Sequence, residues 1–303
     1  MERTQCLIVG TGPAGLSAAI YTARAGVDTL ALGCEPKVAG DYDIDNYFGF
    51  PETVTGRDLI ERGTAQARRF GATLRCERVL AVHHGDNGSF VAKTDKGEYE
   101  ADAVIIAAGV SRVRPGIANL ADYEGKGVSY CVSCDGFFYR GKKVLVLGEG
   151  DYAANQALEL TAFTSDVAIY TQGKPLGMSQ DFADRLAVAG IPVREKTVTT
   201  LSGAPALAAA RLSDGEEIAV DGLFVAMGQA SALDFAKTLG VPLRGAFIHA
   251  DHDQKTDVPG IFAAGDCVGR FLQISVAVGE GAKAGKSAIS YLKGKGLSGR
   301  KEA

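Results

Sequence analysis

Hydrophobic positions along the chain fall into short continuous runs, each followed by a glycine-containing turn and a longer segment of small and apolar residues. The first such block, residues 5–26, reads QCLIVGTGPAGLSAAIYTARAG, and the run VDTLAL follows it directly. A short apolar run bounded by turn residues is typical of a buried strand, whereas the longer segment is typical of a helix. The block therefore predicts a strand, a tight turn, a helix and a second strand.

The same pattern returns in residues 142–172, which read KKVLVLGEGDYAANQALELTAFTSDVAIYTQ. Recurrence of one unit about 140 residues further along indicates an internal duplication. Between the two copies, the sequence predicts a helix over residues 58–70 and short strands within 73–82, 88–95 and 97–109. The fold class that we expect is α/β with an added antiparallel portion.

The length of 303 residues favours two hydrophobic cores over one. Residues 109–119 and 226–235 are rich in turn-forming or small residues and are the candidate crossings between domains. The chain ends with a short apolar strand and a long small-residue helix, which would pack most naturally beside the first unit. We therefore expect one domain from 1–114 and 238–303, with the second, 115–237, inserted in it.

Composition narrows the class of protein. Hydrophobic residues make up 46% of the chain and the net charge is −4, which is typical of a globular protein and gives no reason to expect a nucleic-acid partner. No apolar window is long enough to cross a bilayer, and the N-terminus lacks the basic and small-residue pattern of a signal peptide. Only two of the six cysteines are close together in sequence, so we expect a reducing cytoplasm.

The first turn predicts a bound dinucleotide. Its residues are Gly10, Gly12, Pro13, Ala14 and Gly15. In a GxGxxG turn the glycines permit the tight turn, the approach of a pyrophosphate and close helix packing, and the helix N-terminus offers N–H groups to the phosphates. Glu35 follows at the distance expected of an acceptor for a ribose hydroxyl. The alternative is a glycine-rich turn without a ligand.

Cys131 and Cys134 form a CxxC pair followed directly by Asp135. This spacing permits a short-loop disulfide, and a neighbouring thiol and a helix start are features that can lower the pKa of one thiol so that a thiolate is available. A zinc site is the alternative, but zinc normally takes four ligands, and the chain has neither a second CxxC nor a nearby histidine. Hence we expect no metal. Asp135 is placed either to transfer a proton or to cap a helix.

A third stretch, TDVPGIFAAGDCVG, places Asp266 between a glycine and the last helix. Such a carboxylate suits a polyol such as the ribityl chain of a flavin, and a solvated turn aspartate is the alternative. Taken together, GTGPAG, CVSCDGFFY, the second glycine turn and IFAAGDC resemble the low-molecular-weight thioredoxin reductases in order and spacing over almost the whole chain.

The resemblance implies two Rossmann-like dinucleotide-binding domains, the second inserted in the first, in a three-layer ββα FAD/NAD(P)-binding fold. It also implies FAD as cofactor, a homodimer, and electron flow through FAD and the CxxC pair to a thioredoxin-like protein, with rotation of the inserted domain during turnover. Cys134 would face the flavin and Cys131 would attack the partner's disulfide. The residues that would bind FAD are Gly10, Gly12, Pro13, Ala14, Gly15, Glu35, Asn46, Ala108, Gly109, Gly265, Asp266 and Gln273.

The second glycine turn departs from the family. Glu149 puts a negative charge where a pyrophosphate would lie, and Lys174 is the only cation where NADPH-dependent members carry a cluster for the 2′-phosphate. We therefore favour a donor such as ferredoxin, as in the pyridine-nucleotide-independent, ferredoxin-dependent flavin thioredoxin reductases. Arg140, Lys142 and Lys143 are candidates for docking an acidic carrier, although a solvated face explains them equally well.

Three alternatives stay open. The second turn is a divergent but working NADPH site, or the enzyme runs in reverse as a dithiol oxidase, or the chain is a flavin-binding redox sensor without turnover.

Overall fold

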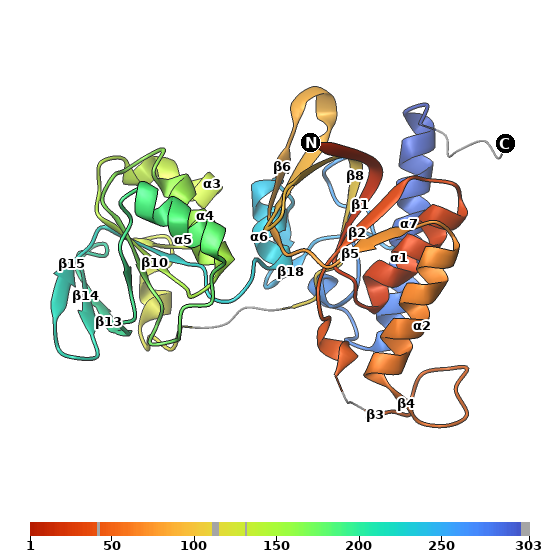
Figure 1. Cartoon of the computed structure of the whole chain (residues 1–303), viewed down its shortest axis with the longest axis horizontal. Helices are drawn as coiled ribbons and strands as arrows, with labels where there is room; N and C mark the ends of the chain where they lie inside the picture. Colours follow the sequence, from red (N-terminus) through yellow and green to blue (C-terminus); the bar gives the residue numbers. More distant parts are fainter. Residues whose placement is uncertain (41–42, 111–114, 131, 298–303) are drawn as a thin grey trace. The chain divides into compact units, whose positions relative to one another are not determined.

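The computed structural model describes residues 1–40, 43–110, 115–130 and 132–297, and the backbone alone for residues 133 and 134. Two compact units make up the chain (Figure 1). Unit 1 comprises Met1–Val110 and Ser231–Ala303, and unit 2 comprises Ser111–Ala230. Unit 2 is thus inserted between the two segments of unit 1. Which nucleotide each unit binds stays a prediction.

The larger sheet of unit 1 has the strand order β5-β2-β1-β8-β7-β6, and β19 pairs with the end of β8. Its strands are β1 (Glu2–Val9), β2 (Thr29–Leu32), β5 (Thr73–Arg75), β6 (Val79–His84), β7 (Phe90–Thr94), β8 (Glu98–Ile106) and β19 (Ile261–Ala263). Strands β5, β2, β1, β8 and β19 run parallel, whereas β7 pairs antiparallel with both β6 and β8. The sheet therefore combines the predicted parallel and antiparallel portions.

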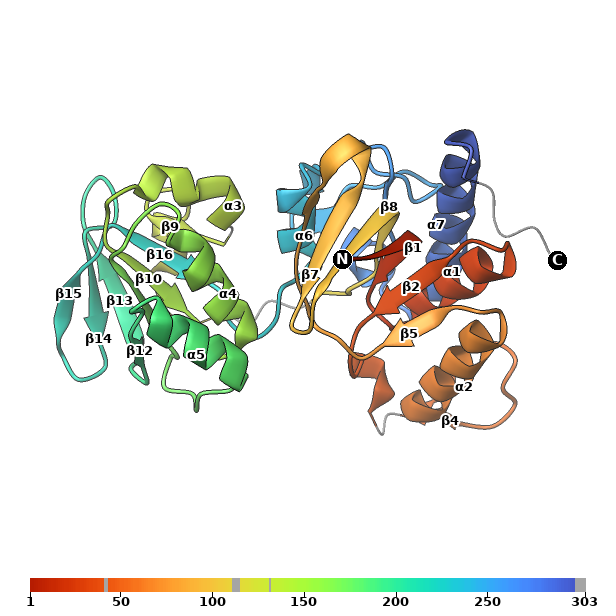
Figure 2. The same cartoon turned by 45° about the horizontal axis from the view of Figure 1, so that its top comes forward.

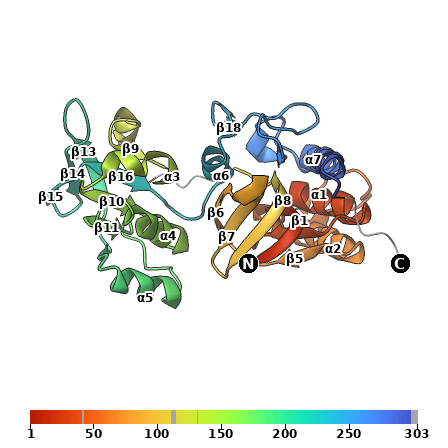
Figure 3. The ribbon, with the colours of Figure 1, turned by 90° about the horizontal axis from the view of Figure 1, so that it is seen from above.

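Helices α1 (Pro13–Arg24), α2 (Gly56–Arg69) and α7 (Ile274–Gly294) gather on one side of this sheet (Figures 1 and 3). Alternate strand residues such as Cys6, Ile8 and Ile105 form the core with Ala18 and Ala284 from the helices. The final helix thus returns to the first unit, as the sequence predicts. The remaining elements of unit 1 are η1 (Lys37–Ala39), β3 (Asp43–Ile44), β4 (Val54–Thr55), η2 (Asp86–Gly88), α6 (Ala232–Thr238), β17 (Leu243–Arg244), β18 (Phe247–Ile248) and η5 (Asp266–Val268).

Two helices of unit 1 show why they begin where they do. Pro13 takes the first position of α1, where its missing N–H costs nothing. The Thr55 hydroxyl accepts a hydrogen bond from the Asp58 N–H at 3.1 Å, which is an N-cap. Because of this cap α2 begins at Gly56, two residues before the start that the sequence predicts.

Unit 2 contains a five-stranded parallel sheet in the order β12-β11-β10-β16-β9. Alternate residues of β10 and β16, such as Leu145, Leu147 and Leu223, pack with Leu201 and Leu212 of the antiparallel β13-β14-β15 meander. Helix α4 contacts β10 (Figure 2) and β11 (Figure 3). The elements are η3 (Leu120–Tyr123), β9 (Val128–Ser129), α3 (Val132–Asp135), η4 (Gly136–Tyr139), β10 (Val144–Leu147), α4 (Asp151–Leu160), β11 (Val167–Tyr170), α5 (Gln180–Val188), β12 (Val193–Arg194), β13 (Val198–Ser202), β14 (Ala209–Leu212), β15 (Glu217–Ala219) and β16 (Gly222–Val225).

Candidate functional site

Four parallel strands of unit 1 end at one edge of the sheet. The Gly10 N–H donates to the Leu32 carbonyl at 2.7 Å, and the Ala107 N–H donates to Val9 at 2.8 Å. The Ala264 N–H donates to Ile106 at 3.0 Å. These bonds bring together the turns that follow β1, β2, β8 and β19. Carboxyl ends of parallel strands are where open α/β sheets bind ligands.

The first glycine turn is closed at two positions and open at a third. A Cβ on Gly10 would lie 2.3 Å from the Ala107 carbonyl oxygen, and one on Gly15 would lie 1.8 Å from the Gly10 carbonyl oxygen. A Cβ on Gly12 would meet only the Pro36 side chain within 4 Å, at 3.8 Å. The closed positions hold strand and helix together, and the open one leaves room for an approaching phosphate.

The start of α1 supplies the donors for such a phosphate. Gly12 is the N-cap residue, and no side chain caps the helix. Backbone N–H groups at an uncapped N-terminus, together with the positive end of the helix dipole, favour an anion. The turn therefore fits the pyrophosphate of a dinucleotide, such as the FAD that the family resemblance implies.

Glu35 lies in the loop directly after β2, and its side chain is exposed. Its backbone has φ 44°, a left-handed conformation that is uncommon for a residue with a Cβ. The Lys37 ammonium donates to the Val110 carbonyl at 2.9 Å, so the Glu35 loop is joined to the segment after β8. Ala108 and Gly109 precede Val110 in that segment and are partly buried. These three predicted residues thus surround the same edge of the sheet as the glycine turn.

Asp266 opens a short 3-10 turn after Gly265, whose φ is 81°. The Gly265 N–H donates to the Glu280 carboxylate at 2.9 Å, and Arg270 lies 3.5 Å from the same carboxylate. The Glu280 side chain is only 7% exposed. Glu280 is not among the site residues predicted from the sequence. The available signal was a single acid among the small residues of the last helix.

Asn46 and Gln273 are 227 residues apart, and the Asn46 amide donates to the Gln273 side-chain oxygen at 3.1 Å. Gln273 is the residue that precedes α7, and Asn46 is exposed. The structure therefore brings together two residues that the family resemblance assigns to the flavin. Binding of FAD by either residue stays a prediction.

The second glycine turn, in unit 2, contains a carboxylate side chain. Glu149 lies between Gly148 and Gly150, and its side chain is 19% exposed. Its carboxylate is 2.7 Å from the Lys174 ammonium and accepts a long bond from the Gly228 N–H at 3.4 Å. The pair joins the turn after β10 to the loop after β11.

The side chain of Gln172, just past the end of β11, is hydrogen-bonded to the backbone of neighbouring segments. Its amide donates to the carbonyls of Pro115 and Val198 at 2.8 and 3.0 Å, and its side-chain oxygen accepts from the Val198 N–H at 2.6 Å. This is the region where a Rossmann unit recognises the nucleotide ribose. The Gln172 side chain therefore supports the loop and has no unused donor for a nucleotide.

The CxxC segment lies in unit 2. Cys131 is outside the described residues, and Cys134 lies in the short helix α3 with its side chain also outside them. The Asp135 carboxylate accepts a hydrogen bond from the Ser129 hydroxyl at 2.6 Å. Phe137 and Phe138 follow with side chains that are 59% and 66% exposed. Asp135 is thus partnered beside the cysteine pair.

A second cysteine pair, which was not predicted from the sequence, lies in unit 1. Cys34 and Cys76 form a disulfide across 42 residues of sequence. Sequence spacing does not reveal it, because the pairing of β2 with β5 brings the two cysteines together. Cys6 and Cys267 are free, and burial raises the pKa of each thiol to about 12. Cys267 is therefore a small buried residue of the core.

The described residues show neither a metal-binding cluster nor a membrane-spanning helix. They contain no group of three or more acidic, histidine or cysteine side chains that would hold a metal ion. Within the same part of the chain, no helix has the length and apolar character that crossing a membrane requires.

Comparison with known proteins places this geometry among relatives. The sequence profile described as "Pyridine nucleotide-disulphide oxidoreductase" matches residues 4–281. The chain is 34% identical to a thioredoxin reductase of Bacillus subtilis (strain 168) over 299 residues, covering 94% of each chain. It is also 34% identical to one of Listeria monocytogenes over 306 residues, covering 94% of this chain and 93% of the relative.

Solved structures extend the comparison. A crystal structure of the atypical thioredoxin reductase TRi from Desulfovibrio vulgaris Hildenborough is 63% identical, with a TM-score of 0.95, covering 96% of this chain and 99% of that one. A ferredoxin-flavin thioredoxin reductase from Clostridium acetobutylicum is 26% identical, with a TM-score of 0.72, covering 97% of this chain and 99% of that one.

Proposed function

The chain belongs to the pyridine nucleotide-disulphide oxidoreductase family, and we propose from this premise that a donor other than a pyridine nucleotide reduces it. Membership makes the chain a flavin disulfide oxidoreductase of the thioredoxin reductase type, with FAD as cofactor and a redox disulfide. In the proposal, electrons pass through FAD and the Cys131–Cys134 pair to a thioredoxin-like protein. The observation that carries the choice of donor is the Glu149–Lys174 ion pair in the second glycine turn.

Glu149 opposes a dinucleotide by charge. A carboxylate about 4 Å from one phosphate charge costs about 4 kcal/mol near a protein surface. The positive charge of Lys174 offsets most of that cost, and a remainder of about 1.4 kcal/mol weakens binding about tenfold. The Glu149 carboxylate lies 2.7 Å from the Lys174 ammonium, so the protein itself supplies the anion that the turn would otherwise take from a ligand.

The side chains of Lys174 and Gln172 both interact with other groups of the protein. Lys174, the cation that the sequence places near the expected 2′-phosphate, is paired with Glu149. Gln172 bonds to the backbone of Pro115 and Val198. A 2′-phosphate needs charge-assisted and preferably bidentate donors. Losing two such bonds, each of about 1.5 kcal/mol or more, weakens binding roughly a hundredfold further.

The name of one relative supports a different donor. The 63% identical protein is named an atypical thioredoxin reductase, and the 26% identical one is named for ferredoxin. The thioredoxin reductases of Bacillus and Listeria are also consistent with the alternative, an NADPH-dependent enzyme with a divergent site. The test must therefore compare the donors directly.

The residues of unit 1 hold the cofactor in this account. The turn at Gly12 and the start of α1 bind the pyrophosphate, Glu35 accepts from the adenosine ribose, and Asp266 accepts from the ribityl chain. When bound, FAD supplies the chemistry that passes an electron pair to a disulfide. Glu280 holds the Asp266 turn through the Gly265 N–H.

The residues of unit 2 carry the electrons onward. Cys134 would be the cysteine that faces the cofactor, and the Cys131 thiolate would attack the disulfide of the thioredoxin-like partner. Asp135, hydrogen-bonded to the Ser129 hydroxyl, gives and takes the proton of the departing thiol. The exposed Phe137 and Phe138 offer an apolar contact beside the pair.

Ferredoxin is the donor class that we assign. Arg140, Lys142 and Lys143 are exposed and lie within four residues of chain in unit 2. Such a group attracts an acidic carrier and speeds its association at low salt. A homodimer in the cytoplasm completes the proposal, and equilibrium sedimentation of the purified protein tests the dimer.

A coupled assay tests the proposed function. Reduced ferredoxin, the holoenzyme and an oxidised thioredoxin are mixed without oxygen, and new thioredoxin thiols are counted. We expect multiple turnovers with the wild type and none with Cys134→Ser, which retains FAD. NADPH in place of ferredoxin should give no thiols above the background without enzyme. Turnover with NADPH and not with ferredoxin contradicts the proposal and supports the divergent NADPH site.

A further inference from the structure

The Cys34–Cys76 disulfide joins the ends of two neighbouring strands in unit 1. Cys34 follows β2 after one intervening glycine, Gly33, and Cys76 follows β5 directly. The Gly33 N–H donates to the Arg75 carbonyl at 3.2 Å, beside the bond between the sulfurs. Cys76 is exposed, and Cys34 is partly buried. An attacking thiolate therefore has access to the Cys76 side of the bond.

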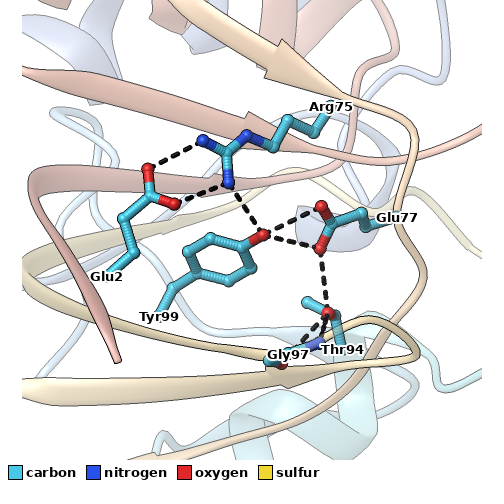
Figure 4. A network of polar contacts seen from close by, with 6 residues as sticks. All are labelled: Glu2, Arg75, Glu77, Thr94, Gly97 and Tyr99. Atoms are coloured by element: carbon cyan, nitrogen blue, oxygen red, sulfur yellow. Dashed lines mark hydrogen bonds and ion pairs between the residues drawn. The ribbon is translucent and has the colours of Figure 1, made fainter.

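The Cys76 side is fixed to the sheet by a polar network (Figure 4). The Arg75 guanidinium donates to both carboxylate oxygens of Glu2, at 2.7 and 2.8 Å, and to the Tyr99 hydroxyl at 3.0 Å. That hydroxyl donates to the buried Glu77 carboxylate at 2.8 Å. The residues on both sides of Cys76 are thus anchored without the disulfide.

The network extends beyond these residues. Glu77 also accepts from the Thr94 hydroxyl at 2.9 Å, and the Lys96 ammonium donates to the Cys76 carbonyl at 2.8 Å. A bidentate Arg–carboxylate pair and charged hydrogen bonds are the stronger polar contacts of a protein. Cys76 is therefore a rigid anchor point at the edge of the sheet.

The Cys34 side, in contrast, is the loop that carries Glu35. Glu35 keeps its left-handed backbone directly beside Cys34. The Pro36 side chain lies against the open position of the first glycine turn. The Thr11 hydroxyl of that turn donates to the Gly33 carbonyl at 3.2 Å. The disulfide therefore ties the loop that would bind the adenosine ribose to the rigid anchor at Cys76.

We propose that Cys34–Cys76 is a second redox-active disulfide, reduced by a thioredoxin-like dithiol, and that its opening loosens the Glu35 loop and speeds release of FAD. The inference rests on FAD binding, which the family implies, and is independent of which donor reduces the enzyme. A disulfide with an exposed sulfur is the kind that exchanges with external thiols. A loop that is already ordered loses less conformational freedom when the ligand binds, so release from it is slower.

The exchange is balanced in atoms and electrons. A thiolate of the external dithiol attacks Cys76 Sγ, which forms a mixed disulfide and releases Cys34 as a thiolate. The second thiol of the dithiol then resolves the mixed disulfide and releases Cys76. The external dithiol is oxidised by two electrons, the Cys34–Cys76 bond is reduced by two, and the thiolates take up protons. An oxidised thioredoxin-like protein reverses the reaction.

The experiment isolates this pair from the CxxC pair. Holoprotein carrying Cys131→Ser and Cys134→Ser is incubated anaerobically with reduced thioredoxin. Thiols are then alkylated and located by peptide mass spectrometry, and FAD release is followed by the fluorescence of the free flavin. We expect labelling of Cys34 and Cys76 and release of FAD on the order of tenfold faster than from the untreated protein.

Two controls decide the interpretation. The buried thiols Cys6 and Cys267 should stay unlabelled, which shows that the protein has not unfolded. The same protein with Cys34→Ser and Cys76→Ser added should release FAD rapidly with or without thioredoxin. If this variant does not fold, chemical reduction of the folded parent supplies the same comparison.

The overturning results are equally definite. If an excess of reduced thioredoxin leaves Cys34 and Cys76 unlabelled in the folded protein, the pair is structural. If both become labelled while the rate of FAD release stays unchanged, the disulfide does not control the release of the cofactor. Neither result touches the proposed donor, which the ferredoxin assay tests separately.

Discussion

The two glycine turns of the chain share a G-x-G backbone and differ in the side chain that stands between the two glycines. Gly10 and Gly148 both have positive φ, and at each a Cβ would strike a backbone oxygen of a neighbouring strand end. In the first turn the intervening residue is Thr11, whose hydroxyl bonds to the Gly33 carbonyl. In the second it is Glu149, whose carboxylate bonds to Lys174. The glycines thus specify the backbone conformation. The side chain between them determines whether the turn favours or opposes binding of an anion.

The largest effect is expected when a negative charge is introduced into the first turn. Thr11→Glu places a carboxylate where the pyrophosphate of FAD would bind, at a cost of about 4 kcal/mol. We expect FAD affinity to fall by a factor of several hundred, measured by fluorescence titration of the apoprotein. Thr11→Gln is the matched control, because it also loses the hydroxyl and carries no charge. Equal affinities for the two variants would show that charge in this turn has no role.

Removal of Glu280 should have the next largest effect. Glu280→Ala leaves the buried Gly265 N–H without its acceptor and Arg270 without its carboxylate, at a cost of about 2 kcal/mol in the free energy of unfolding. Urea unfolding measures the loss, and flavin release should also quicken, because the Asp266 turn is no longer held.

Glu280→Gln is the matched control for this effect. It keeps an acceptor for the Gly265 N–H, so it should lose less stability than Glu280→Ala. A full loss in Glu280→Gln would instead assign the effect to the charge facing Arg270.

Removal of the negative charge from the second turn should have the opposite effect, on binding of a pyridine nucleotide. Glu149→Thr removes the internal anion and frees Lys174, so binding of NADH and NADPH should strengthen by about tenfold, or about 1.4 kcal/mol. Calorimetric titration with each nucleotide measures the change. Glu195→Thr removes an equal charge from an exposed position of the same unit and should leave nucleotide binding unchanged. Equal behaviour of the two variants would remove the physical basis for an alternative donor.

A smaller effect is expected from pH at Cys267, next to Asp266. Burial raises the pKa of this thiol from 9.0 to about 12, so the folded protein keeps it neutral while the unfolded chain ionises above pH 9. Its contribution to stability is therefore complete below pH 9 and is lost as pH rises toward 12. Between pH 8 and 9.5 the wild type should lose roughly 0.8 kcal/mol more than Cys267→Ala. Urea unfolding at the two pH values measures the difference, and parallel losses would contradict it.

The features that depend on local sequence pattern could be predicted from the sequence alone. Strand and helix periods predicted both Rossmann-like units, and the charge of Glu149 was visible in the second turn. Its partner Lys174 was also visible as a lone cation, but the bond between them depends on how the loops after β10 and β11 meet.

Other features depend on contacts between distant segments. The Cys34–Cys76 bond follows from the parallel pairing of β2 with β5, which cysteine spacing does not encode. Glu280 is hidden because a helix of small residues gives no reason to single out one acid, until the close packing of α1 and α7 places it behind Gly265. Long-range partners of this kind are set by tertiary packing, whereas glycine turns are set by local geometry.

The most direct test of the central claim is an anaerobic titration of the wild-type holoenzyme with NADPH, followed through the visible absorbance of the flavin. The account predicts that the yellow colour persists at micromolar NADPH and disappears when reduced ferredoxin is added to the same cuvette. Prompt bleaching by one equivalent of NADPH would contradict it, because the second turn would then accept a pyrophosphate despite Glu149.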